Sequence, residues 1–78
     1  MNANRRKQVK VAMEQLEMLM ASIEGIRDEE QDYYDNMPEA IQVGVKGDKA
    51  QEYIDSLDDC FNELESASYS LADVLNNR

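Results

Sequence analysis

Carboxylates are the side chains in this chain that are best placed to do chemistry. A run of acids spaced mostly three or four apart, with Lys49 the one base among them, follows residue 48: Glu52, Asp55, Asp58, Asp59, Glu63 and Glu65. At that spacing like charges repel mildly within a helix. The run indicates a docking surface for a basic groove, in which carboxylates stand in for phosphates. The alternative interpretation is a solvated face that keeps a small domain in solution.

The other reactive groups do not assemble into a recognisable site. A second acidic cluster, residues 28–35, lacks the alternating ligands, central Gly and distal Glu of a calcium-binding loop. The chain contains no His, so it has neither a Glu-x-x-His metal pair nor a base for its serines and Cys60. It also lacks a glycine-rich phosphate loop. We therefore expect no catalysis, no cofactor and no metal.

The charge distribution limits the possible partners. The chain has 17 acidic and 8 basic residues, a net charge of −9. Four of the bases lie in the first ten residues, and the remaining four against 17 acids leave residues 11–78 at −13. Phosphate backbones and anionic lipids would be repelled, which predicts no direct nucleic-acid partner and no membrane partner. No apolar run is long enough for a signal peptide or a membrane span, so we expect a cytoplasmic protein.

Two stretches with the same apolar periodicity must position these groups. In a heptad lettered a to g, residues 9–37 and 50–75 place mostly apolar side chains at a, d and e, with Glu30 at a and Ser68 at e among the polar exceptions, which predicts two long helices. In the first stretch these positions hold Val9, Leu16, Ile23 and Met37; Ala12, Leu19, Ile26 and Tyr33; Met13, Met20 and Tyr34. In the second they hold Ala50, Leu57, Leu64 and Leu71; Tyr53, Cys60, Ala67 and Val74; Ile54, Phe61 and Leu75. We expect all three columns to form the core, with Cys60 buried.

The break between the stretches sets the element boundaries. Pro38 disfavours helix at the preceding residue, so the first helix should cover residues 4–35, capped by Asn4. The connecting loop, 36–47, includes a short turn after Pro38 and three apolar residues to seal the core: Ile41, Val43 and Val45. Asp48 should cap a second helix over residues 48–76. The predicted fold is all-α, a single domain over residues 1–78 formed by an antiparallel two-helix hairpin.

Additional apolar residues predict contact with another protein. A 78-residue chain without disulfide or metal has a marginal core, and association is the remaining way to stabilise it. Apolar or aromatic side chains outside the core columns provide candidate contacts: Val11, Met18, Ala21 and Tyr69. They suit either self-association into a four-helix bundle or insertion of a target helix. We predict a homodimer that also binds a protein partner, one with a basic surface if the carboxylates take part.

The break and the acidic second helix also carry a resemblance. Residues 34–42 with their Asn-x-Pro-Glu sequence, residues 46–48 and residues 54–57 resemble a group of short, uncharacterised acidic helical-hairpin proteins of bacteriophages and bacterial mobile elements. The resemblance covers about half the chain, and it implies no specific activity and no functional residues. With it, the expected function is non-catalytic binding and inhibition of a host protein in the bacterial cytoplasm. The alternatives are an acidic nucleic-acid mimic and a purely structural or regulatory helical bundle.

Overall fold

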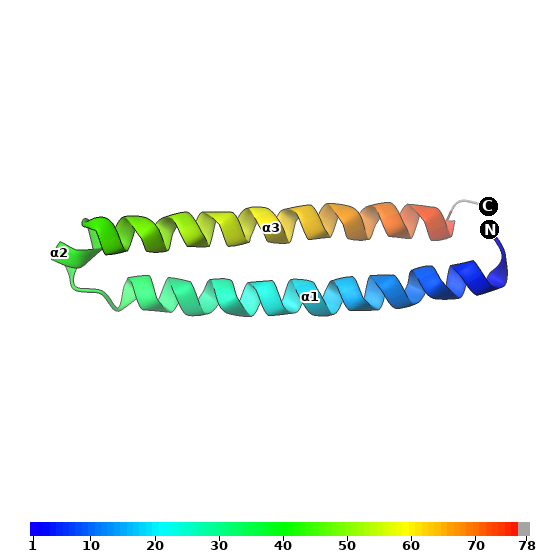
Figure 1. Cartoon of the computed structure of the whole chain (residues 1–78), viewed down its shortest axis with the longest axis horizontal. Coiled ribbons are helices and arrows are strands. Elements are labelled where there is room, and N and C mark those ends of the chain that lie inside the picture. The colour runs from blue at the N-terminus through cyan, green and yellow to red at the C-terminus, as the bar shows by residue number, and fades with distance from the viewer. Residues whose placement is uncertain (77–78) are drawn as a thin grey trace.

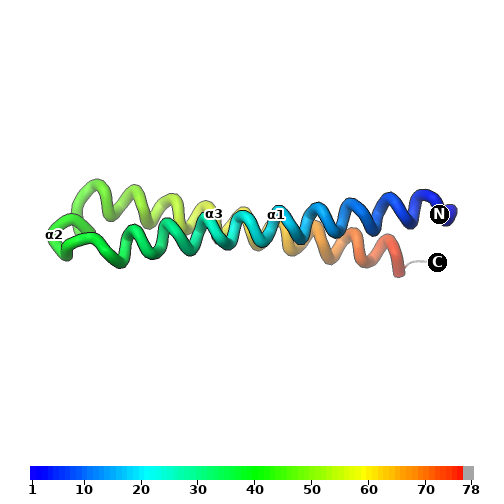
Figure 2. The backbone as a smooth tube through the Cα atoms, turned by 90° about the horizontal axis from the view of Figure 1, so that it is seen from below, coloured from blue at the N-terminus to red at the C-terminus, as the bar shows by residue number. Residues whose placement is uncertain are grey.

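The computed structural model describes residues 1–76 and is all-helical over that range, as predicted. It contains two long helices, α1 (Ala3–Asp35) and α3 (Val45–Asn76), joined by a connection that holds the four-residue helix α2 (Glu39–Gln42). The long helices lie side by side and run in opposite directions (Figure 1). Seen from below, they cross at a shallow angle (Figure 2). No helix within residues 1–76 combines the length and apolar character needed to cross a bilayer.

The start of α1 is explained by a cap and by its neighbour. The helix begins at Ala3, and the Asn2 side chain caps it by accepting a hydrogen bond from the Arg5 backbone N–H at 2.8 Å, so the prediction of Asn4 as the cap is wrong. The basic residues of this first turn oppose the helix dipole. Arg6 resolves part of that conflict, because its guanidinium donates to the Leu75 carbonyl at the C-terminal end of α3, 2.8 Å away.

The connection is tighter than the predicted loop. The side chain of Gln42, in α2, donates to the Tyr34 carbonyl at 2.9 Å and so satisfies one of the last carbonyls of α1. Helix α3 begins at Val45, three residues before the predicted start, so Asp48 lies in its first turn and is not its cap. Gly47 is buried within α3, where a Cβ would collide with the Gln42 backbone. Its missing side chain therefore allows α2 to pack against α3.

The core is small and lies near this connecting end. Ala50 and Ile54 are the buried apolar residues among those described, with exposed fractions of 0% and 3%. The three residues predicted to seal the core, Ile41, Val43 and Val45, are instead exposed. The other a and e positions, such as Leu16 and Leu64, are half-buried along the line where α1 meets α3, which we call the seam.

The shape confirms how little the chain encloses. Its Cα atoms extend over 59 × 15 × 13 Å with a radius of gyration of 17.6 Å, whereas a globular chain of this length has about 12 Å. Its accessible surface is 5881 Å², against about 4,900 Å² for a globular protein of the same mass. Within residues 1–76 the chain is a thin rod in which each long helix packs against a single other long helix.

Candidate functional site

The d column lies outside the core, contrary to the prediction. Leu19, Ile26 and Tyr33 of α1 are 48, 51 and 53% exposed, and Tyr53 and Val74 of α3 are 55 and 37% exposed. Ala67 is also exposed, while Ala12 and Cys60 are half-buried. The physical reason is width. The columns a, d and e span about 100° of the helix surface, and one neighbouring helix covers the a and e part of that arc only.

The two d columns lie on the same side of the rod. Two antiparallel helices that pack through the same heptad positions are related by a half-turn about an axis that passes between them at right angles to the rod. This half-turn exchanges the helices and reverses their direction, but it does not move a residue from one side of the rod to the other. Every remaining letter therefore lies on the same side in both helices. We call the resulting surface the d-face. It consists of Ala12, Leu19, Ile26 and Tyr33 from α1 and Tyr53, Cys60, Ala67 and Val74 from α3.

A second apolar surface lies on α1, on the side turned away from α3. It was predicted from sequence, and we call it the α1 strip: Val11, Met18 and Ala21. Val11 is 49% and Met18 71% exposed, and Ala21 is exposed too. Gly25 follows in the same column, and the space around its missing side chain is open. Tyr69 is 65% exposed but belongs to α3, so the structure does not bring it together with the other three.

The predicted acidic run is divided by its contacts. Glu52, Asp55, Asp59 and Glu63 are exposed on α3, and Lys49 lies 3.5 Å from Glu52 as an ion pair. Asp58 and Glu65 are half-buried at b positions, beside the seam and on the side opposite the d-face. The carboxylates therefore do not form a single row. They are spread around the solvent-facing half of α3.

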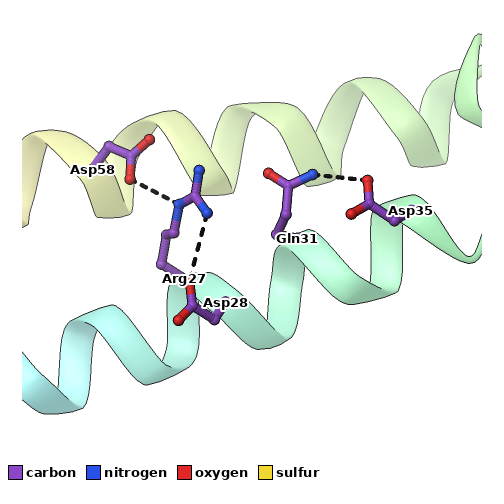
Figure 3. Close-up of polar contacts among 5 residues, drawn as sticks. All are labelled: Arg27, Asp28, Gln31, Asp35 and Asp58. Carbon is purple, nitrogen blue, oxygen red and sulfur yellow. Dashed lines mark hydrogen bonds and ion pairs between the residues drawn. The ribbon is translucent and has the colours of Figure 1, made fainter.

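Arg27 forms an ion pair with one of these carboxylates, Asp58. It reaches across from α1 to Asp58 on α3, where its Nε donates to the carboxylate at 2.9 Å, and Asp28 lies 3.5 Å from the same guanidinium (Figure 3). The hydrogen bond to Asp58 raises the pKa of Arg27. An open hollow of about 280 Å³ beside this group has an apolar floor of Ile23, Leu57 and Phe61. Glu24 also lines this hollow, so its three carboxylates outnumber the one guanidinium and disfavour an anionic ligand.

The remaining reactive groups stay dispersed. Cys60 is a half-buried free thiol, so the prediction of full burial is wrong. Within residues 1–76 no three metal-ligating side chains gather closely enough to hold an ion. Comparison with known proteins found no matching family model, no matching curated protein and no matching solved structure.

Sequence reasoning missed the d-face as a surface, although the signal was present. Three apolar columns per heptad are more than a single antiparallel neighbour can cover. The flanking g positions give no further signal, because they are mixed: Gln8, Gln15, Ser22, Ser56 and Ser70 are uncharged, whereas Glu29, Lys49 and Glu63 are charged.

Proposed function

We propose that the chain is a non-catalytic protein-binding module that works as a homodimer of antiparallel helix pairs and holds a target protein on the α1 strip. The observation that carries the proposal is the exposure of Met18, 71%, on a side of α1 that α3 does not cover. Flexible methionines suit a surface that receives a target helix. The resemblance to phage and mobile-element proteins supports a host protein as the target, with inhibition as the result.

The test compares captures from a bacterial lysate by the parent chain, by Met18→Glu and by Asn62→Glu. Asn62 is an exposed position of α3, so the control adds the same carboxylate away from the strip. We expect one protein to be recovered by the parent and the control but lost with Met18→Glu. With that protein purified, calorimetry should show at least a tenfold loss of affinity for Met18→Glu. Equal binding by all three chains would refute the role of the strip.

A nucleic-acid mimic is the second candidate, and the exposed carboxylates of α3 favour it. Replacing Asp55, Asp59 and Glu63 with Asn or Gln removes three exposed charges and leaves the Arg27–Asp58 pair in place. If these groups mimic phosphates, the neutralised chain should bind its partner much more weakly, and the affinity of the parent should fall steeply with salt. The parent should also displace nucleic acid from that partner. Unchanged binding that is insensitive to salt would refute the mimic.

The third candidate, a structural or regulatory bundle, makes the opposite prediction. Neither the strip variant nor the neutralised variant should then alter which proteins are captured. The stability of the homodimer should still depend on its apolar contacts, because they would be the main role of the chain.

A further inference from the structure

We propose that the d-face is covered by a second copy of this chain, packed face to face with its ends reversed. The inference rests on the proposed homodimer and adds which surface forms it and in which orientation. Two arrangements with two-fold symmetry bring one d-face onto another. In one, the connecting ends of both copies lie together. In the other, each connecting end lies over the terminal end of its partner, where α1 starts and α3 finishes.

The area of the rod's d-face side favours a second copy as the occupant. The rod is 59 Å long and 15 Å wide, so one of its sides presents on the order of 800 Å², the share that each partner contributes to a standard stable interface. The excess of the measured surface, 5881 Å², over the globular expectation is about 1,000 Å². A second rod of the same length and width covers this side along its whole length.

The size of the d-face side chains selects the reversed orientation. The contacts of Arg6 with Leu75 and of Arg27 with Asp58 fix the register of α1 against α3. In that register the d-face is graded from the terminal end to the connecting end, in the order Val74, Ala12, Ala67, Leu19, Cys60, Ile26, Tyr53, Tyr33. Reversal places the tyrosines of one copy over the alanines of the other, so large side chains meet small ones. Matched ends would set tyrosines against tyrosines and leave voids between alanines.

Charge selects the same orientation independently. The connecting half of the rod, residues 22–61, has 12 acidic and 3 basic residues, a net of −9. The terminal half, residues 1–21 and 62–76, has 5 acidic and 4 basic residues, a net of −1, because the basic cluster of α1 lies there. Matched ends would bring the two strongly acidic halves together. Reversal places each acidic half beside the basic start of the partner's α1 and relieves that repulsion.

The orientation can be measured without disturbing the d-face of the full chain except at Cys60. In a Cys60→Ser background, Ala40→Cys places one spin label on α2, at the connecting end, where position 40 is exposed. Pulsed electron spin resonance should give a label separation on the order of 50 Å, close to the 59 Å length of the rod. Matched ends would instead give a separation below about 30 Å, the sum of the rod width and two label linkers. That result would overturn the reversed orientation but leave the homodimer intact.

A matched pair of variants tests the surface. Leu19→Glu changes the d-face, and Met18→Glu makes the same kind of change at the adjacent position in the α1 strip. In analytical ultracentrifugation, Leu19→Glu should weaken the dimer by roughly a hundredfold or more, since each dimer contains two copies of the change. Met18→Glu should change it less than threefold. The reverse result would assign the interface to the α1 strip. A parent chain that stays monomeric at millimolar concentration would refute both the homodimer and this inference.

Discussion

The two sides of the rod flank the same seam and differ in composition. On the d-face side, the residues next to the seam are apolar and mostly exposed, as Tyr53 and Val74 are in α3. On the opposite side, the b positions of α3 are largely polar and yet half-buried: Gln51, Asp58, Glu65 and Ala72. Helix α3 thus has its polar flank covered more than its apolar one, whereas in α1 both flanks are mostly exposed. Exposing apolar side chains to water costs free energy in an isolated rod, and this cost is removed when the apolar side is buried against protein.

The seam lies between the two sides, and a substitution there is expected to have the largest effect on stability. Ile54→Ala removes the largest side chain buried in it, and the free energy of unfolding should fall by about 2 to 5 kcal/mol because a cavity forms where little can rearrange. Urea unfolding followed by circular dichroism measures the change. A loss below about 1 kcal/mol would show that α1 and α3 do not pack in this register.

The next prediction contrasts the two sides directly. Ile26→Gln and Glu24→Gln introduce the same residue on one helix, the first on the d-face and the second on the polar side. With the d-face buried in a dimer, Ile26→Gln should cost roughly 2 to 4 kcal/mol per chain. Glu24→Gln should stay within about 0.5 kcal/mol, as an exposed polar substitution does. Equal, small effects would mean that the d-face faces water in solution and would remove the contrast.

Dilution tests the same contrast without a substitution. If burial of the d-face comes from a second copy, the melting temperature should fall by about 5 °C for each tenfold dilution, because unfolding then also separates two chains. Scanning calorimetry or circular dichroism over three decades of concentration measures this. A melting temperature that does not change would show that no second copy covers the d-face.

The smallest effect is expected on the polar side. Arg27→Met breaks the contact with Asp58, and both side chains are partly open to solvent, at 32 and 48% exposure. The melting temperature should change by a few degrees at most, and 0.5 M salt should remove most of the difference from the parent. A large, salt-independent loss would show that this pair, and not the apolar contacts, holds the two helices together.

Much of the architecture follows from the chain alone. The apolar periodicity predicts two long helices, and Pro38 ends the first of them where it is seen to end, at Asp35. The basic start of α1 also predicts a neighbour with a negative dipole end, and Arg6 meets the Leu75 carbonyl there. The helix end and the direction of the dipole depend on residue types and local spacing, whereas the Arg6–Leu75 contact itself joins groups 69 residues apart and required the tertiary structure.

The tertiary structure decided which part of the apolar stripe is covered. Sequence places a, d and e side by side, but only the rotation of each helix against its neighbour selects a and e for the seam and leaves Leu19, Ile26 and Tyr33 exposed. It also decided that Asp58 pairs with Arg27, and that Gly47 is a point of close packing inside α3. Each of these outcomes joins groups far apart in the chain, or depends on the angle at which two helices meet. Local sequence spacing encodes neither the contacts between distant groups nor the rotation of one helix against another, because a helix forms equally well at any rotation about its own axis.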